Sequence, residues 1–271
     1  MLLVVIKMEK IFKLMKAALK EKQMVKNIMR GFKEDEFKLY LQFIVDAKTK
    51  KIVSAEALSR WKSKKQGLIS PGNYIAIMER VGLISKHDFN MFEMVCHQLE
   101  KWNTTKFNNV MISCNFTRIT LSEKDFVEKI KEISDKYTFD RSMLCIEIIE
   151  DTIEKDINHA FFNMKECKNL GFTVALDDLG SGYITLANIC DYPVDIVKID
   201  REILLKAVDE RGKALFKGAV ELAHKLNLKV VSEGVETEEQ NQFVIDADCD
   251  YIQGFYYHRP IPREEAEKIL L

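Results

Sequence analysis

The sequence contains no apolar run long enough to cross a membrane. Its most apolar stretch, residues 1–6, falls far short of the roughly 20 apolar residues that a spanning helix needs. Lys7 and Lys10 follow this stretch and no small-residue cleavage site does, so a secretory signal is not expected. We therefore expect a cytoplasmic protein without a membrane-spanning segment.

Cysteine and histidine form no pattern that would hold a metal. The six cysteines stand singly, no Cys-x-x-Cys pair occurs, and the five histidines are dispersed. Most of the cysteines lie in apolar runs, where cysteine usually acts as a small buried residue. We expect reduced, buried thiols, and neither a disulfide framework nor a zinc site.

Neither sign of charge is in excess over the whole chain. The 41 basic and 42 acidic residues give a formal net charge of −1. This balance gives no reason to expect a nucleic-acid polymer or a membrane as a partner, although a small anionic ligand would need only a local site. Proline and glycine are also scarce, at 4 and 11 of 271 residues, and no linker or low-complexity segment divides the chain. The composition is that of a globular protein with a sizeable core.

Signals for strands and helices alternate along most of the chain. Residues 1–34 have no glycine or proline before Gly31 and predict one or two amphipathic helices, which either pack on the core or bind a partner. A polar turn at 46–50 lies between two strand signals and predicts an antiparallel hairpin. Strands, most of them separated by helices, are expected at 36–45, 51–58, 110–115, 144–148, from Thr173, and at 195–199, 229–233 and 251–253.

This alternation predicts an α/β fold. Strands separated by helices favour a parallel sheet, and about eight of them in about 250 residues favour closure into a TIM-like (β/α)8 barrel. The opening hairpin gives this barrel an antiparallel first strand pair. We expect an N-terminal helical segment over residues 1–34 and the barrel over residues 35–271.

Capping residues predict where several helices begin. Two starts fit a capping box or a variant of it, and two others carry a single capping residue. The two capping boxes are Ser85 with Asp88 and Thr237 with Gln240. The two single capping residues are Ser70, before Pro71 and a helix that ends at Gly82, and Ser122.

From the second predicted strand onward, each strand ends in a polar side chain. These are Glu56, Asn115, Glu147, Asp177 with Asp178, Lys198, Glu233 and Gln253. Because the carboxyl ends of parallel barrel strands meet at one face, we expect these side chains to converge. So many carboxylates beside a single lysine would repel one another unless cations lay between them.

The candidate ligands are all oxygen donors, which favours Mg²⁺ or Mn²⁺ over zinc. They outnumber what one small cation needs, so two ions that share a bridging carboxylate fit better, and such a pair suits phosphodiester hydrolysis. Taken singly, the residues have plainer interpretations. Asp177 and Asp178 could form an exposed turn, any one acid could be solvated or ion-paired, and Lys198 could be an ion-pair partner at the edge of the core.

An ordered series of motifs contains these residues. It runs through Glu56-Ala57-Leu58 with Arg60, Asn115-Phe116-Thr117, Glu147-Ile148-Ile149-Glu150, Asp177 to Tyr183, Lys198-Ile199-Asp200, Glu233-Gly234-Val235-Glu236 and Gln253-Gly254-Phe255. The series resembles the EAL-domain family of bacterial cyclic di-GMP phosphodiesterases, from about residue 34 to the last residue.

The resemblance implies hydrolysis of cyclic di-GMP to linear pGpG by a homodimer. One Mg²⁺ or Mn²⁺ ion would be held by Glu56, Asn115, Glu147 and Asp177, and a second by Asp177, Asp178 and Glu233, whereas Ca²⁺ would inhibit. The catalytic residues would be Lys198, Glu233, Glu236 and Glu56, with Lys198 positioning or helping to deprotonate the attacking water. Substrate would contact Gln42, Leu58, Arg60 and Gln253. A loop that couples the site to dimerisation would involve Glu150, Gly180, Ser181 and Gly182.

Three departures from the family pattern lie near that loop. Ile149 stands in place of a threonine, Leu179 of a phenylalanine and Ile184 of a serine. No metal ligand is changed, but these departures would weaken activity or make it sensitive to dimerisation. The alternative is therefore a receptor that binds the dinucleotide without hydrolysis and acts through a protein partner. A metal-dependent lyase of the enolase type, with Lys198 as the base, is a third interpretation from fold analogy.

Overall fold

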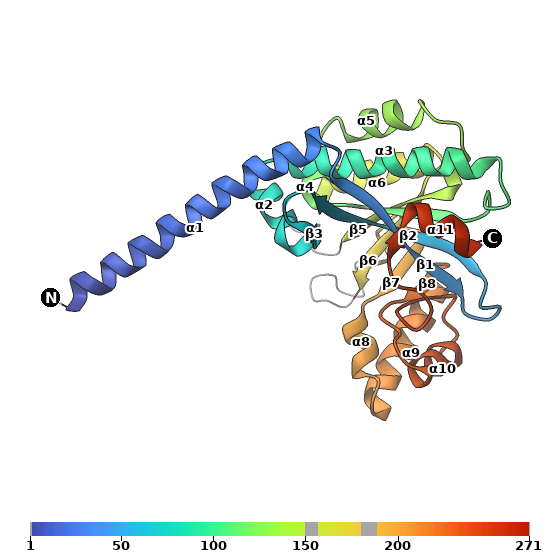
Figure 1. The fold of residues 1–271 in the computed structure, drawn as a ribbon. Coiled ribbons are helices and arrows are strands. Elements are labelled where there is room, and N and C mark those ends of the chain that lie inside the picture. Colours follow the sequence, from blue (N-terminus) through green and yellow to red (C-terminus); the bar gives the residue numbers. More distant parts are fainter. Residues whose placement is uncertain (1, 150–156, 180–188, 271) are drawn as a thin grey trace. The chain divides into compact units, whose positions relative to one another are not determined.

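The chain is described by a computed structural model over residues 2–149, 157–179 and 189–270 (Figure 1). It divides into two compact units. The first joins Met1–Lys38 to Ser59–Ile84, and the second joins Leu39–Leu58 to Ser85–Leu271. Among the described residues, no helix combines the length and the apolar character that crossing a bilayer requires.

The first unit is built around a small aromatic core. Its elements are helix α1 (Leu2–Lys33), strand β3 (Gly67–Ile69), the 3-10 turn η1 (Pro71–Asn73) and helix α2 (Ile75–Arg80). Phe37, Trp61 and Tyr74 pack on one another with ring centroids 5.3–5.8 Å apart. The buried carboxylate of Glu36 accepts a hydrogen bond from Trp61 Nε1 at 2.9 Å, so the polar groups of this core are paired with each other.

The described residues form a closed barrel of eight strands, which belongs to the second unit except for the first two residues of its first strand and the last five of its second. The strands are β1 (Phe37–Asp46), β2 (Ile52–Ser63), β4 (Met111–Phe116), β5 (Leu144–Ile149), β6 (Thr173–Leu179), β7 (Ile196–Ile199), β8 (Lys229–Ser232) and β9 (Tyr251–Gln253). Neighbours from β2 round to β9 are parallel, whereas β1 is antiparallel to β9 and closes the ring by pairing with β2. The predicted TIM-like α/β barrel with an antiparallel first strand pair is confirmed.

Helices lie outside the barrel strands (Figure 1). They are α3 (Ile84–Asn103), α4 (Arg118–Leu121), α5 (Phe126–Ser134), α6 (Ile157–Asn169), α8 (Arg201–Lys206), α9 (Glu210–Lys225), α10 (Glu238–Asp246) and α11 (Arg263–Leu270), with a 3-10 turn η2 (Arg141–Met143) and a short edge strand β10 (Ile261–Pro262). Phe116 of β4 shows how they pack, since its ring lies 5.7 Å from that of Phe92 on α3 and 5.1 Å from that of Phe126 on α5. Parallel strands covered in this way are buried on both faces.

An apolar layer fills the barrel interior beneath the polar strand ends. It consists of Ile44, Cys145, Ala175, Ile196 and Val231, which form a buried cluster separate from the outer core. In the parallel strands, each of these residues stands two positions before a polar residue. Because side chains alternate along a strand, residues two apart face the same side. The apolar layer therefore supports a polar layer at the carboxyl ends of the parallel strands.

The capping box predicted at the start of α3 is wrong. The helix begins at Ile84, and Asp88 is buried instead of capping its own helix. Its carboxylate accepts hydrogen bonds from the amide of Thr117 at 3.0 Å and from the hydroxyl groups of Thr117 and Thr120 at 2.8 and 2.6 Å. Asp88 therefore fastens the segment that follows β4, a tertiary role that competes with the local one.

Other helix starts have mixed outcomes. Ser122 ends α4 instead of starting a helix, and α5 begins at Phe126. The helix predicted after the Ser-Pro pair is divided at Tyr74 into η1 and α2. The capping box of Thr237 and Gln240 is confirmed at the start of α10, with both of its hydrogen bonds formed.

All six cysteines are free thiols, as expected. Five of them are buried, but Cys190 is exposed, so the expectation of burial is wrong for that residue.

Candidate metal centre

Each barrel strand, or for β8 the residue directly after it, supplies one polar side chain to a single layer at the carboxyl end of the parallel strands. From β1 to β9 these are Gln42, Glu56, Asn115, Glu147, Asp177, Lys198, Glu233 and Gln253. Pairing of β4 with β5 sets Asn115 directly opposite Glu147. The layer is well shielded from solvent, since Glu147 is 2% exposed and Lys198 is 1% exposed. The convergence predicted from the strand ends is therefore present in the structure.

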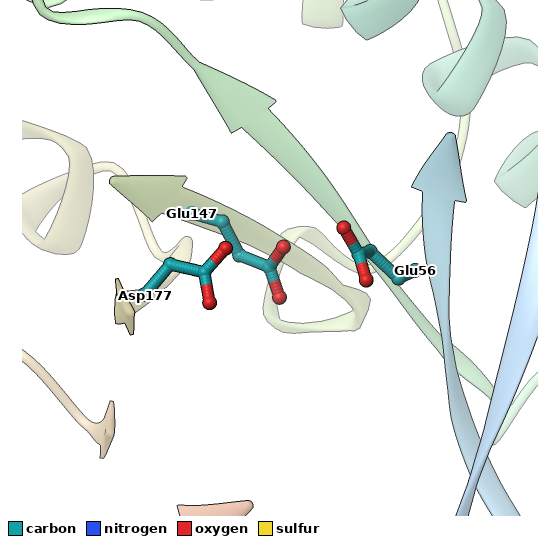
Figure 2. Close-up of side chains that lie close together, drawn as sticks. All are labelled: Glu56, Glu147 and Asp177. Atoms are coloured by element: carbon teal, nitrogen blue, oxygen red, sulfur yellow. The ribbon is translucent and has the colours of Figure 1, made fainter. Parts of the chain in front are cut away.

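The carboxylates of Glu56, Glu147 and Asp177 point toward one another from β2, β5 and β6 (Figure 2). One oxygen from each lies within 4.8 Å of the others. Asp177, Asp178 and Glu233 form a second set with the same spacing. Each of these two sets of three side chains is called a carboxylate group here. Because Asp177 belongs to both groups, it has the position that a ligand bridging two cations requires.

A bulge in β6 explains how two consecutive carboxylates reach the same site. Successive side chains of a regular strand point to opposite faces. In β6 the pairing with β7 shifts register between Leu176 and Leu179, and Asp178 has a φ angle of 60°. Aspartate tolerates this left-handed conformation better than most residues. The bulge turns Asp178 back toward Asp177 and Glu233, which strand alternation alone would not allow.

Lys198 lies at the centre of the acidic layer. Its Nζ is 2.7 Å from Glu233, 3.1 Å from Asp177, 3.3 Å from Glu147 and 3.6 Å from Glu56. Burial alone would lower the pKa of this amine, but the four carboxylates hold the pKa of Lys198 well above its ordinary value. The side chain therefore stays charged and offsets part of the negative charge of the layer.

Neighbouring amides orient Glu56. Asn115 Nδ2 donates to one carboxylate oxygen at 2.8 Å, and Gln253 Nε2 donates to the other at 2.5 Å. Gln253 Nε2 also lies 3.4 Å from the side-chain oxygen of Gln42. Burial would raise the pKa of Glu56, but the charge of Lys198 and these amides hold it below its ordinary value. Glu56 is thus fixed in direction and ionised.

The charged form of each of the other four carboxyl groups in the centre is disfavoured, so their pKa values are raised. Burial raises the pKa of Glu147 well above its ordinary value and also raises that of Asp177, against the opposing charge of Lys198. Burial, again opposed by Lys198, raises the pKa of Glu233 to about 8. Burial and the adjacent Asp177 raise the pKa of Asp178 to about 6. The protein alone therefore supplies too little positive charge for this many carboxylates.

The donor set fits hard divalent cations. Five carboxylates and one ammonium in the described layer carry a formal charge of −4 when all are ionised, which two divalent ions would balance. Glu147 Oε2 is buried and has no hydrogen-bond partner among the described residues, although buried acceptors are normally satisfied. Both carboxylate groups offer only oxygen, which suits Mg²⁺ or Mn²⁺.

A cleft of about 260 Å³ opens beside the layer. It is lined by Gln42, Glu56, Arg201, Glu233, Gly234, Glu236, Gln253, Gly254 and Phe255. Three predicted catalytic or substrate-binding residues, Gln42, Glu236 and Gln253, thus line the same cleft as Glu56 and Glu233, one glutamate from each carboxylate group.

The sequence patterns did not identify Arg201 and Phe255 as cleft residues. Arg201 Nη2 forms an ion pair with Glu236 at 3.0 Å, which places a cation beside the carboxylates. Its stem covers Gly234, where an added Cβ would lie 2.4 Å from Arg201 Cγ and the φ angle is +67°. The guanidinium of Arg259 lies 4.3 Å from the ring centroid of Phe255. Arg201 could have been found from the sequence, because it directly follows the Lys198-Ile199-Asp200 motif.

Some predicted site residues are not brought into this cleft. Leu58 is half-buried on β2, two positions beyond Glu56. Arg60 belongs to the first unit, where its Nη1 donates to the carbonyl of Ser59 at 2.9 Å. The residues assigned to dimer coupling lie outside the described part of the chain, namely Glu150, Gly180, Ser181 and Gly182.

The described residues thus form an α/β barrel of the TIM type with a cluster of buried carboxylates at the carboxyl end of its parallel strands, where metal ions could bind. Within this class of barrels, the EAL domain matches residues 25–260, and the chain belongs to the EAL domain family.

Curated relatives agree with this assignment. The chain is 27% identical over 254 residues to the cyclic di-GMP phosphodiesterase NbdA of Pseudomonas aeruginosa, covering 93% of this chain and 32% of that protein. It is 28% identical over 244 residues to the bifunctional diguanylate cyclase/cyclic di-GMP phosphodiesterase MucR of the same organism, covering 90% of this chain and 36% of that protein. The chain spans 30–40% of the length of the curated relatives it matches.

Solved structures show the same barrel. The phosphodiesterase domain of PaMucR in complex with c-di-GMP has a TM-score of 0.85 and 28% identity, covering 90% of this chain and 99% of that one. The EAL enzyme Bd1971, bound to cAMP and cyclic di-GMP, has a TM-score of 0.87 and 26% identity, covering 94% of this chain and 70% of that one.

Proposed function

We propose that this chain is a metal-dependent phosphodiesterase that hydrolyses cyclic di-GMP to linear pGpG and so lowers the level of that second messenger. The proposal depends on one observation: the two carboxylate groups share Asp177, and Asp177 Oδ1 lies 3.1 Å from Nζ of the buried Lys198. Relatives named as cyclic di-GMP phosphodiesterases, and a neighbour solved with that dinucleotide, support the choice of substrate.

In this proposal the two carboxylate groups hold two Mg²⁺ or Mn²⁺ ions. One would be held by Glu56, Asn115, Glu147 and Asp177, and the other by Asp177, Asp178 and Glu233. When bound, such ions supply a Lewis acid for the phosphate oxygens and lower the pKa of a coordinated water.

Lys198 would position the attacking water and stabilise the negative charge that develops on it. Its ammonium lies 2.7 Å from Glu233 and 3.1 Å from Asp177, so a water near these carboxylates would also be in reach of Nζ. Because the surrounding carboxylates hold the pKa of Lys198 high, hydrogen-bond donation is a more suitable role than proton removal. This also argues against a lyase that uses Lys198 as its base.

The cleft residues would hold the dinucleotide beside the carboxylates. Gln42 and Gln253 offer amide groups next to Glu56, and Glu236 offers a carboxylate held by Arg201. Leu58 and Arg60 are further substrate contacts implied by the family motif.

The testing experiment is a chromatographic assay. The protein is incubated with cyclic di-GMP in Mg²⁺, Mn²⁺, Ca²⁺ or chelator, with cAMP and cGMP as alternative substrates, because the neighbour Bd1971 was also solved with those ligands. We expect pGpG only from cyclic di-GMP and only with Mg²⁺ or Mn²⁺. Ca²⁺ should support little turnover, since its larger and more flexible shell positions the water poorly. Turnover in chelator would contradict the two-metal proposal.

The receptor alternative predicts a different result from the same samples. Cyclic di-GMP would bind but remain intact in every metal, and the substitutions Ile149, Leu179 and Ile184 would become the first residues to revert to the family pattern. A Glu56→Ala variant separates the two interpretations further, because it should abolish turnover while leaving the fold intact.

We also propose a cytoplasmic homodimer whose helical segment ends near residue 34. Light scattering of the purified chain, with and without cyclic di-GMP, measures the oligomeric state. A monomer under both conditions would contradict this part of the proposal.

A further inference from the structure

The first helix carries an apolar stripe that the unit around it does not bury. Phe12, Met15 and Leu19 of α1 are 69%, 60% and 67% exposed. At 100° per residue they fall within a sector of about 60° on the helix surface. Single exposed apolar residues are common, but three on one face of one helix form a continuous strip.

This strip is not an extension of the face by which α1 packs. The packed face is marked by Ile28, which is fully buried, and by Met24, which is partly buried against the aromatic core of the first unit. At 100° per residue, Met24 and Ile28 lie about half a turn away from the strip formed by Phe12, Met15 and Leu19. A surface that covers the strip must therefore approach α1 from the side opposite to that core.

The same helix is strongly basic. Leu2–Lys33 contains nine lysines and arginines and two glutamates, a net charge of +7, whereas the rest of the chain has 32 basic and 40 acidic residues, a net charge of −8. The overall value of −1 conceals this asymmetry. Lys16 and Lys20 are exposed and border the apolar strip. The surface that covers the strip should therefore be negatively charged.

A second copy of α1 fits these facts poorly. The spacing of Phe12, Met15 and Leu19 matches a heptad seam that Met8 and Val5 continue toward the first residue, but the next two seam positions toward residue 33 are Lys22 and Lys26, so the seam ends at Leu19. Pairing would also bring two helices of charge +7 together in either orientation, and like charges destabilise such a pair.

We propose that the segment of α1 around Phe12–Lys20 binds the surface of an anionic lipid bilayer. The helix would lie in the interface, with Phe12, Met15 and Leu19 among the acyl chains and its lysines among the headgroups, without crossing the bilayer. A row of Phe, Met and Leu side chains with Lys side chains beside it is a pattern found in such interfacial helices. This proposal is independent of the proposed catalytic function.

The experiment is vesicle co-sedimentation of the full chain. We expect binding to vesicles of phosphatidylglycerol and phosphatidylcholine, much weaker binding to phosphatidylcholine alone, and a decrease with added salt. Each lysine near an anionic surface contributes roughly a fivefold increase in affinity, so Lys16→Glu with Lys20→Glu should weaken binding by roughly 25-fold or more. Phe12→Ser with Leu19→Ser should also weaken it strongly, through lost apolar burial.

Matched controls come from the second unit. Val208 is 84% exposed and Lys217 is exposed on α9, so Val208→Ser and Lys217→Glu change similar surface groups outside α1 and should leave vesicle binding unchanged. The proposal is overturned if both vesicle types bind equally, if the α1 variants sediment like the unaltered chain, if the unaltered chain stays in solution, or if the variants convert a dimer to a monomer without changing sedimentation. The last result would assign the strip to a second copy.

Discussion

Glu147 is a residue whose burial is unfavourable in the protein alone and whose proposed role is to hold a cation. It is 2% exposed, its Oε2 has no hydrogen-bond partner among the described residues, and it faces two further carboxylates in the same layer. Such a group is unfavourable in the protein alone unless a cation is bound. Natural proteins tolerate conflicts of this kind mainly at functional sites.

We therefore predict opposite effects of Glu147→Gln on activity and on the metal-free fold. Turnover should fall by more than about 100-fold, because even the partners of metal ligands contribute about 10–100-fold. The melting temperature in chelator should rise or stay unchanged, because the amide removes a buried negative charge without changing the shape of the side chain. Thermal unfolding in chelator and the chromatographic assay measure the two effects, with Glu221→Gln on the exposed face of α9 as the control. A lower melting temperature together with normal turnover would contradict the assignment.

At this scale, the sequence predicts the identity of the site residues better than their geometry. Strand-end position was enough to select Glu56, Glu147 and Asp177, because the carboxyl ends of parallel barrel strands all lie at the same face of the barrel. The contribution of Asp178 depends on a bulge, and bulges leave only a weak local signal. The position of Arg201 directly after the Lys198-Ile199-Asp200 motif places it near the site, but its ion pair with Glu236 joins two separate segments, and spacing along the chain does not show such a contact.

Within helix α9, two glycines should respond in opposite ways to replacement by alanine. An added Cβ at Gly212 would lie 1.7 Å from the carbonyl oxygen of Lys206, whereas one at Gly218 would meet nothing within 4 Å. Gly218→Ala should therefore raise the stability by about 0.5–1 kcal/mol, since alanine loses less backbone entropy in a helix. Gly212→Ala should lower it by about 1–3 kcal/mol, because backbone must move. Urea unfolding of both variants measures the difference, and equal effects would contradict the close approach of Lys206 to α9.

The carboxylate of Asp250, directly before β9, connects that strand to α9 and β8 through three hydrogen bonds. Its carboxylate lies 2.7 Å from Lys229 Nζ, 2.9 Å from His224 Nε2 and 2.9 Å from the amide nitrogen of Val230. Burial alone would raise the pKa of Asp250, but these contacts hold it below its ordinary value. A carboxyl group whose pKa is lowered by folding stabilises the protein above its unfolded pKa, and this stabilisation is lost as the pH falls through the folded pKa.

Asp250→Asn should therefore lower the free energy of unfolding by about 1–2 kcal/mol near pH 7, as expected for a partly buried carboxylate that loses its hydrogen bonds to charged partners. The difference from the unaltered chain should shrink below about pH 4, near the ordinary aspartate pKa. Urea unfolding at a series of pH values tests this. Asp248→Asn is the control, because Asp248 is 69% exposed and makes only a surface ion pair with Lys48. A difference that does not vary with pH would show that the charge of Asp250 is not what matters.

Element boundaries were predicted well where local chemistry decides them. The capping box of Thr237 and Gln240 forms because both partners lie within one turn of the helix. The capping box expected with Asp88 does not form, because the Asp88 carboxylate accepts hydrogen bonds from the hydroxyl groups of Thr117 and Thr120, which are distant in the sequence. The number and order of the barrel strands follow from apolar patterning alone, so they survive such local errors.

The molecule as a whole combines a barrel unit that contains the candidate centre with a first unit that supplies none of its carboxylates. The proposed ligands of the centre come from β2, β4, β5 and β6 and from Glu233 directly after β8, all within residues 39–58 and 85–271. A cation bound there would add a further connection among strands that backbone hydrogen bonds and the ion pairs of Lys198 already join. Ligand binding to the folded state stabilises it by about 2.7 kcal/mol at a concentration 100 times Kd.

Hydrogen exchange should therefore respond to metal in one unit and not in the other. Adding Mg²⁺ or Mn²⁺ to chelator-treated protein should slow amide exchange in β4 to β8, while exchange in residues 20–33 of α1 and in α2 stays unchanged, because those helices contain no carboxylate of the two groups. Glu147→Gln should remove most of the slowing, and an equal ionic strength of sodium chloride should not reproduce it, since screening acts on all exposed charges alike. If metal slowed exchange equally in both units, its effect would be general and not centred on the barrel. If it slowed exchange only in α1, the cation site would have to be sought among the few acids of that helix and not in the acidic layer.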